Sequence, residues 1–260
     1  MQILQFNVLD GCREDTRYEK MFGWLKRQNA DVIAFNELNG WNKKEFNNEM
    51  TKLDLPHTHL FEMESSPYFV GIASKHPIEM IEEIEDYPTY HGLLHVKINN
   101  VHFLVVHLTP FESTEREKET KRIIELTKDI EEPVIVLGDF NTLSPLDKDQ
   151  YEKMGTYEKL VENSVLARQH TLNQEINFKP MKMLLESGFN DICYSKDFHH
   201  TFPGKIEPDI ERDIRLRIDY ILGNEHLLDY EPECKFISTS EVETLSDHYP
   251  TMCILKDTNQ

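Results

Sequence analysis

Short runs of apolar residues recur along the chain, each bounded by polar or turn-forming residues. Runs of about four to eight such residues are typical of β-strands that pack in a core. Eight runs predict strands: QILQFNV (2–8), DVIAF (31–35), YFVGIAS (68–74), LLHVKI (93–98), VHFLVVHL (101–108), VIVLGDF (134–140), IDYIL (218–222) and YPTMCIL (249–255). This number of strands indicates a substantial β-sheet.

Three segments between the strands show the spacing of amphipathic helices. Residues 16–29 and 114–130 each begin with Thr followed three positions later by Glu, which predicts a capping box at the start of an apolar helical pattern. Residues 181–187 form a shorter pattern that stops before Gly188, a residue type common at helix C-termini.

The segment 146–178 is polar and mixed, and no Gly/Ser-rich linker or repeat separates it from the rest of the chain. We expect a partly helical insertion beside the functional site, with a solvated connecting segment as the simpler alternative. A chain of 260 residues with 39% hydrophobic content is long enough for one large core, so residues 1–260 are predicted to form a single domain.

Polar side chains stand at one end of six predicted strands. Four strands carry them at the carboxyl end and two at the start. The start of a strand lies beside the end of its antiparallel neighbour, so all six ends meet at one edge if the two late strands run antiparallel to the others. Open α/β sheets bind ligands at such an edge. The residues are Asn7, Glu37, His107 and Asp139 at carboxyl ends, and Asp219, Asp247 and His248 at strand starts.

The stretch GDFN (138–141) carries a carboxylate and an amide two positions apart. If the chain stays extended through Phe140, Asp139 and Asn141 point the same way and Phe140 faces the core. A carboxylate there can take or orient a water proton, and an amide can hold the nucleophile or an oxyanion. Each polar residue alone also fits an ordinary turn or a satisfied core histidine, but turn chemistry does not readily explain six of them at strand ends.

The net charge is −19, from 28 basic and 47 acidic residues. This charge disfavours a surface that wraps nucleic acid by bulk attraction, because polyanion-binding proteins normally carry a basic stripe. A phosphate substrate would therefore be held locally, and a divalent cation can reverse the field inside an acidic cleft.

The cysteines and the apolar runs indicate in which cellular compartment the protein is located. Cys12, Cys193, Cys234 and Cys253 are far apart without a secretory context, so we expect reduced thiols. The N-terminus enters a predicted strand at once, and no apolar run approaches the ~20 residues of a membrane-spanning helix. These features predict a cytoplasmic location.

Taken in order, Asn7, Glu37, His107, GDFN (138–141), RIDYIL (217–222) and SDH (246–248) resemble the motifs of the endonuclease/exonuclease/phosphatase superfamily, which has the deoxyribonuclease-like fold. The resemblance spans nearly the whole chain, and the ordered set is specific although no single motif is. It implies an α+β fold, a four-layer α/β/β/α sandwich of two packed mixed β-sheets flanked by helices. It also implies a metal-dependent hydrolase of phosphate esters.

The resemblance implies a metal site built from oxygen ligands. Glu37 would be the principal Mg²⁺ ligand, with Asn7 and Asp247 as direct or water-mediated ligands. Mg²⁺ suits such a site because it prefers oxygen ligands, keeps several waters and needs only one or two carboxylates. Mn²⁺ could replace it.

The resemblance also assigns the groups that act on the substrate. Asp139 would activate the attacking water and Asn141 would position it. His248 would contact the scissile phosphate, oriented by Asp219 in the manner of a catalytic triad. His107 would be a second phosphate contact or an acid near the leaving group.

The surroundings of His107 depart from part of the superfamily. Some nucleases pair this histidine with a Glu just before the strand that here begins at Tyr68, whereas this chain has Ser65, Ser66 and Pro67 there. Glu62 and Glu64 are the candidates to replace it.

Two further side chains lie close to the motifs. Tyr68 and Arg217 could each contact phosphate. Core packing for Tyr68 and a surface ion pair for Arg217 are equally good interpretations.

The reaction class transfers from the resemblance more safely than the substrate does. We expect a phosphodiesterase or nuclease acting by in-line attack of water, with nucleic acid as one candidate substrate and no protein partner indicated. The alternatives are a phosphomonoesterase of a small metabolite or inositol phosphate, a binuclear metallophosphoesterase, and a non-catalytic binding module. The binuclear class would need Gly-Asn-His and Gly-His-x-His motifs, which the chain lacks.

Overall fold

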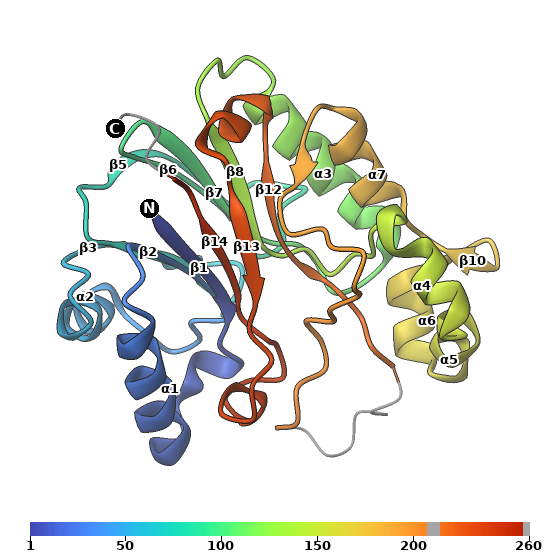
Figure 1. Cartoon of the computed structure of the whole chain (residues 1–260), viewed down its shortest axis with the longest axis horizontal. Helices are drawn as coiled ribbons and strands as arrows, with labels where there is room; N and C mark the ends of the chain where they lie inside the picture. Colours follow the sequence, from blue (N-terminus) through green and yellow to red (C-terminus); the bar gives the residue numbers. More distant parts are fainter. Residues whose placement is uncertain (207–213, 257–260) are drawn as a thin grey trace.

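The computed structural model describes residues 1–206 and 214–256. Two six-stranded mixed β-sheets pack against each other, and helices cover their outer faces (Figure 1). The predicted α+β sandwich of four layers is therefore confirmed. That the chain forms a single domain stays a prediction.

The first sheet has the order β13-β14-β1-β2-β4-β3. The second has the order β11-β12-β8-β7-β6-β5. The strands of the first sheet are β13 (Glu233–Phe236), β14 (Thr251–Ile254), β1 (Gln2–Asn7), β2 (Val32–Asn36), β4 (Val70–Ser74) and β3 (His57–Phe61). Those of the second are β11 (Asn190–Asp191), β12 (Asp219–Gly223), β8 (Val134–Asp139), β7 (Val101–His107), β6 (Leu93–Ile98) and β5 (Glu79–Ile84).

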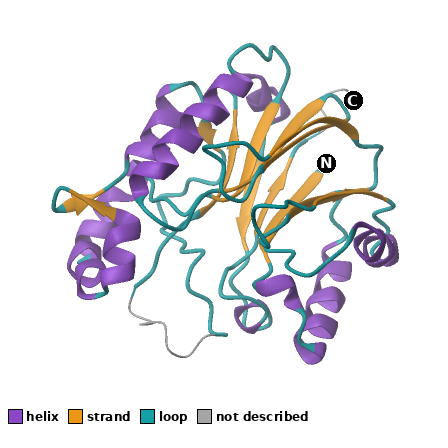
Figure 2. Ribbon diagram, turned by 180° about the vertical axis from the view of Figure 1, so that it is seen from behind, coloured by secondary structure: helices purple, strands orange, loops and turns teal. Residues whose placement is uncertain are grey.

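Alternation along each strand divides the apolar residues between two layers. In β2, Val32 and Ala34 face the other sheet, whereas Ile33 and Phe35 face outward. The outer face of the first sheet is covered by α1 (Asp15–Gln28) and α2 (Lys43–Lys52), and that of the second by α3 (Ser113–Thr127) and α7 (Lys179–Glu186), as Figure 2 shows from behind.

The segment 146–178 folds mainly into short helices, as predicted. These are α4 (Lys148–Lys153), α5 (Thr156–Glu162) and α6 (Ser164–His170), and the hairpin of β9 (Thr171–Leu172) and β10 (Glu175–Ile176) follows them. Short 3₁₀ helices lie between the larger elements: η1 (Asp10–Cys12), η2 (Pro145–Asp147), η3 (Glu225–Tyr230) and η4 (Val242–Thr244).

All eight predicted strands and all three predicted helices are present, within a few residues of the predicted bounds. The two capping boxes are wrong, because the helices begin earlier, with Glu14 and Glu112 at the N-cap and no side-chain cap bond at either. The apolar pattern did not predict α2, in which only Phe46 and Met50 are buried, or edge strands such as β5, whose side chains are mostly exposed. A strand or helix that buries so little carries a weak apolar pattern.

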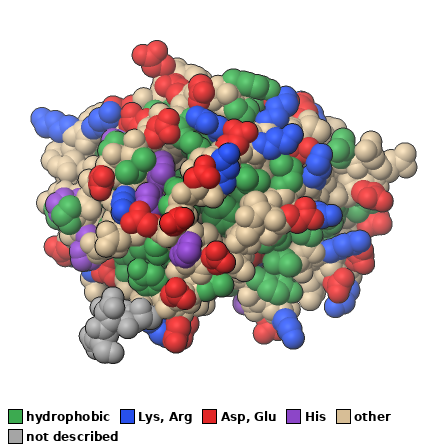
Figure 3. All heavy atoms as spheres, turned by 90° about the horizontal axis from the view of Figure 1, so that it is seen from above, with side chains coloured by type: hydrophobic (Ala, Val, Ile, Leu, Met, Phe, Trp, Pro, Cys, Tyr) green, Lys and Arg blue, Asp and Glu red, His purple; other side chains and the backbone are tan. Residues whose placement is uncertain are grey.

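Within the described residues, no helix has both the length and the apolar character that a membrane span requires. The predicted cytoplasmic location stays a prediction. Figure 3 shows Lys and Arg side chains interspersed with Asp and Glu on the face that it draws.

Candidate active site

The polar strand ends meet where the space between the two sheets opens at one end. β1 is parallel to β2 and β7 to β8, whereas β14 and β12 run antiparallel to β1 and β8, as predicted. His107 and Asp219 are both register partners of Asp139. Asp139 follows Leu137, and His107 follows Val105, in rows of side chains that face the other sheet. The apolar layer between the sheets thus ends in polar side chains.

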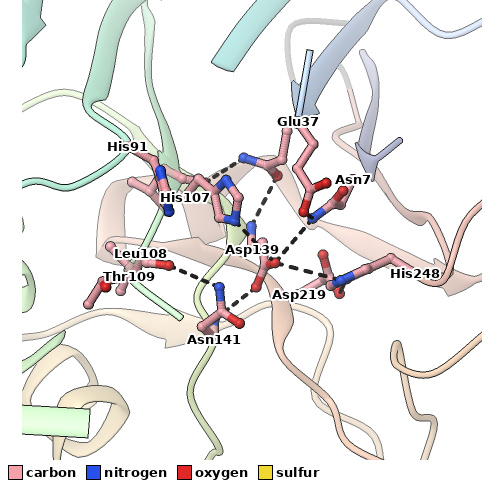
Figure 4. Close-up of polar contacts among 12 residues, drawn as sticks. Asn7, Glu37, His91, His107, Leu108, Thr109, Asp139, Asn141, Asp219 and His248 are labelled. Carbon is pink, nitrogen blue, oxygen red and sulfur yellow. Dashed lines mark hydrogen bonds and ion pairs between the residues drawn. The ribbon is translucent and has the colours of Figure 1, made fainter. Parts of the chain in front are cut away.

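The carboxylate of Glu37, directly after β2, is held from two sides. Nδ2 of Asn7 donates to Oε1 at 3.0 Å, and the N–H of Asp10 donates to Oε2 at 3.1 Å. The same Nδ2 donates to Oδ2 of Asp139 at 3.1 Å, so Asn7 links the two acids (Figure 4). The Asn7 oxygen accepts the N–H of Leu9, which means that Asn7 presents a donor, not an oxygen ligand, to the carboxylates here.

His248 stands between two acids of the second sheet. Its Nδ1 lies 2.7 Å from Oδ2 of Asp219, and its Nε2 lies 3.7 Å from Oδ2 of Asp139. Burial by itself would lower the pKa of His248, but the charges of Asp219, Asp247 and Asp139 outweigh burial and raise this pKa well above its usual value. The surrounding acids thus favour the imidazolium form of His248, whose Nδ1 is held by Asp219.

The acids of the site outnumber its cations. Burial raises the pKa of Asp139; the charge of His248 opposes this, and those of Asp219 and Glu37 add to it. Burial is also the largest cause of the raised pKa of Glu37, to which Asp247 adds repulsion. Among the residues that the structure describes, two sets of side chains bring ligand atoms within 4.8 Å of one another: Glu37, His107 and Asp139, and Asp139, Asp219 and His248. A buried group of acids with too few cations suits a bound metal ion.

Two buried amides that the sequence analysis did not select support these acids. Oδ1 of Asn36 accepts the N–H of Asp139 at 3.1 Å, and its Nδ2 donates to the carbonyl of Val106 at 2.8 Å. Nε2 of Gln5 donates to Asn36 and also to Asp219 at 3.0 Å. Both amides lie in apolar strands on the face toward the other sheet. A polar residue inside an otherwise apolar strand could therefore have indicated from the sequence that these two residues support the site.

The backbone around Asp139 differs from the extended chain that was predicted. Asn141 has φ of 48°, its N–H donates to Oδ1 of Asp139 at 2.9 Å, and its Nδ2 donates to the carbonyl of Leu108 at 2.9 Å. Phe140 is fully buried, as predicted. Gly138 has φ of 142°, and a Cβ there would collide with the carbonyl of Val106. Glycine at this position lets β8 approach β7 closely.

Tyr68, His91 and His107 are aromatic rings clustered beside the acids. The His91 ring stacks on that of His107 at 4.5 Å between centroids, and Tyr68 meets both rings edge to face. His91 was missed, although it precedes the strand 93–98 by two residues and thus repeats the pattern of polar residues at strand starts. Glu62 and Glu64 do not replace the missing Glu, because both are exposed and Ser66 contacts His91 instead.

These side chains line one pocket of about 290 Å³. The insertion contributes Leu166, Gln169 and His170 of α6 to its wall. Arg116 of α3 holds that wall in place, because its guanidinium donates to the carbonyls of Thr109 and Gln169. The segment 146–178 therefore contributes side chains to the wall of the site. The remaining lining residues are Glu37, Tyr68, His91, His107, Pro110, Phe111, Asp139, Asn141, Phe202, Ile218, Asp247 and His248.

Arg217 is not among the lining residues. Its side chain is 2% exposed, pairs with Asp147 and Asp191 at 2.7 Å each, and stacks over Tyr220. The structure therefore contradicts both a phosphate contact and a surface ion pair for Arg217. The buried acids that receive it come from η2 and β11, far away in sequence.

Two of the four cysteines are bonded to each other. Cys193 and Cys234 form a disulfide with 5.1 Å between their Cα atoms, whereas Cys12 and Cys253 are free and buried. The prediction of four reduced thiols is wrong for the bonded pair. Nothing in their spacing indicates the contact, because the loop after β11 and the edge strand β13 meet only when the two sheets pack.

Comparison with known proteins adds to this geometry. A family model described as "Endonuclease/Exonuclease/phosphatase family" matches residues 4–248. No curated protein sequence matches the chain.

Three solved structures resemble the chain over 99% of its length and 100% of theirs. They are an AP endonuclease from Archaeoglobus fulgidus (TM-score 0.76, 20% identity), a 3'-5' exonuclease from Neisseria meningitidis (0.69, 14%), and a 3' phosphatase from Neisseria bound to a product DNA hairpin (0.69, 18%). At these identities the likeness establishes the fold.

Proposed function

Because the chain belongs to the endonuclease/exonuclease/phosphatase family and is a phosphoric ester hydrolase, we propose that its pocket hydrolyses phosphodiesters of nucleotides or short nucleic acids with bound Mg²⁺. The observation that carries this proposal is the convergence of three groups on one carboxylate oxygen. Oδ2 of Asp139 lies 3.1 Å from Asn7, 3.6 Å from His107 and 3.7 Å from His248.

The donor set fits a hard divalent cation. Glu37 and Asp247 supply carboxylate oxygens to an acid-rich pocket, and the Asn7 amide orients the carboxylates of Glu37 and Asp139 by donating to both. Glu37 and Asp247 would hold Mg²⁺, or Mn²⁺ in its place, because such ions take oxygen ligands and need only one or two carboxylates; Asn7 could add an oxygen ligand only if its side-chain amide turned over. A bound divalent cation polarises a phosphoryl oxygen and offsets the charge that grows on it.

Asp139 is placed to act on the nucleophile. Its pKa is raised chiefly by burial, which makes it a stronger base than an exposed Asp, and Asn141 stands next to it in the pocket. Water held between them attacks phosphorus and gives its proton to Asp139, while the bond to the leaving oxygen breaks. No covalent intermediate with the protein is required.

His248 would stabilise the transition state. The imidazolium is held by Asp219 through Nδ1, so Nε2–H faces the pocket and donates to a phosphoryl oxygen as negative charge develops. Asp219 is in turn held by Gln5 and by its own N–H on Thr201. The protein thus supplies a rigid donor before the substrate arrives.

The substrate class rests on two observations. One structural neighbour is named an AP endonuclease and another is bound to a product DNA hairpin, which supports a nucleotide-containing substrate. The net charge of −19 favours a short or small one, because a long polyanion would be repelled. The size of the pocket, about 290 Å³, and a neighbour named as a 3' phosphatase support phosphomonoester hydrolysis as the second candidate.

Both candidates are tested with purified protein, Mg²⁺ and three substrates: bis(4-nitrophenyl) phosphate, a single-stranded oligonucleotide and the same oligonucleotide with a 3' phosphate. We expect metal-dependent turnover that EDTA abolishes. Release of inorganic phosphate alone would favour the phosphomonoesterase, whereas chain cleavage would favour the nuclease.

Variants separate the roles of the residues. Asp139→Asn should lower kcat by at least ~100-fold, because one acid/base group contributes that much. Glu37→Gln should raise the Mg²⁺ concentration required for half-maximal activity. The matched control is Glu82→Gln, an exposed acid on β5. Wild-type turnover by Asp139→Asn at saturating Mg²⁺ would contradict the mechanism.

A further inference from the structure

His107, the histidine expected near the leaving group, has its Nε2 3.6 Å from Oδ2 of Asp139. It is 4% exposed, and its Nδ1 has no hydrogen-bond partner among the described residues. Burial, together with the neighbouring His91 and His248, lowers the pKa of His107 well below its usual value. Among the described residues, no Lys or Arg lines this pocket, and on the side away from His248 it presents His91 and His107 (Figure 4). A leaving oxygen on that side needs an imidazole N–H as its hydrogen-bond donor.

His91 is built to be such a donor. Its Nδ1 lies 2.7 Å from Oγ of Ser66, and the same Oγ accepts the N–H of Tyr68 at 3.2 Å. The Ser66 hydroxyl has one hydrogen, and donating it to Nδ1 satisfies both buried atoms. In the other tautomer, the hydroxyl hydrogen has no acceptor among the described residues. Ser66 thus places the imidazole hydrogen on Nε2.

The Nε2–H of His91 is available to a ligand. His91 lines the pocket, and no described side chain or backbone group accepts a hydrogen bond from Nε2. The ring is held face to face by His107 and edge to face by Tyr68. The donor therefore has a fixed direction before a substrate binds, which is what transition-state stabilisation requires.

The backbone after His91 is also constrained. Gly92 has φ of 69°, and a Cβ there would collide with Met63 and Phe61. Leu93 then begins β6, which pairs antiparallel with β7 in the register Leu93 to Val106. The start of β6 thus lies beside the end of β7, where His107 stands. Local backbone and strand register together place His91 in the pocket.

We propose that His91 is a catalytic residue that donates its Nε2–H to the leaving oxygen of the phosphate ester, and that Ser66 is a positioning residue that selects the tautomer. The inference rests on the proposed function. His91 keeps its proton: the donated hydrogen bond stabilises the negative charge on the leaving oxygen as its bond to phosphorus breaks, and solvent water supplies the proton that completes the alcohol.

The test compares two leaving groups on one phosphoryl group, methyl 4-nitrophenyl phosphate and methyl phenyl phosphate. The poorer leaving group, phenolate, depends more on a donor. His91→Phe, which keeps a stacked ring, should lower kcat by about 100-fold for the phenyl ester and clearly less for the 4-nitrophenyl ester. His91→Gln, which retains an N–H near the Nε2 position, should restore most of the loss. The kcat of Ser66→Ala should lie between those of His91→Phe and His91→Gln, and its loss should again be larger for the phenyl ester.

His57→Phe on β3 is the matched control, and thermal unfolding checks that each variant is folded. Equal losses for both esters would show that His91 is structural, and no loss would show that it does not touch the leaving group. Either result with an active wild type overturns this inference alone. A wild type that hydrolyses neither ester, nor any substrate named above, would overturn the proposed function as well.

Discussion

Asn36 offers a direct test of whether the buried amides hold the site together. The side chain is fully buried between the sheets and joins β1, β7 and β8 through three hydrogen bonds. Asn36→Leu keeps the branched shape of the side chain, although the two methyl groups take more room, and removes all three hydrogen bonds. The N–H of Asp139 and the carbonyl of Val106 would then each lose a buried partner.

The magnitude follows from those two backbone groups. A buried donor or acceptor that loses its partner costs about 1–3 kcal/mol, so Asn36→Leu should lower the free energy of unfolding by roughly 2–6 kcal/mol. In a chain of this size, each kcal/mol lowers Tm by about 2–4 °C. The change should therefore be large enough to see in a single thermal scan.

The assay is urea unfolding followed by circular dichroism, with kcat measured on the aryl diester. We expect lower stability together with a lower kcat, because the backbone that carries Asp139 loses its anchor. Asn48→Leu, an exposed site on α2, is the matched control. A loss of less than about 1 kcal/mol for Asn36→Leu would refute the reasoning, since the buried groups would then have found other partners.

Three further predictions concern the rest of the chain. Gly138→Ala should separate β7 from β8 and lower kcat more than KM rises, which steady-state kinetics would show; an unchanged kcat would contradict the close approach to Val106. Burial lowers the pKa of His95 to about 4 and that of His170 to about 3, so the unfolded chain binds protons first as pH falls below 6.5. The free energy of unfolding should accordingly drop by up to about 1.4 kcal/mol per pH unit for each of them. His170→Gln should flatten that slope in urea titrations between pH 7 and pH 5, and an equally steep slope would count against a buried neutral His170. Alkylation in denaturant should label Cys12 and Cys253 alone before reduction and all four cysteines after it, as counted by mass spectrometry; labelling of all four without reduction would disprove the Cys193–Cys234 disulfide.

Local patterns were enough to predict the strands and much of the candidate site. The strand-end positions of Asn7, Glu37 and Asp139 are readable because apolar alternation marks where a strand runs and where it stops. β12 and β14 run antiparallel to β8 and β1, so the starts of these two late strands lie beside the carboxyl ends of their neighbours. Asp219 and His248, which stand at or just before those starts, therefore reach the same edge as Asn7 and Asp139. Their assembly in one pocket thus follows from short-range order and strand direction.

Other features depend on contacts between distant segments. The burial of Arg217 depends on acids in η2 and β11, and the disulfide depends on the two sheets bringing their edges together. The tautomer of His91 depends on Ser66, which lies in the segment before β4. The direction of its ring depends on stacking against His107, at the end of β7. The apolar periodicity of a sequence indicates which face of a helix or strand is buried, but not which residues pack against that face. The packing of the two sheets decides those partners, and only the tertiary structure contains that information.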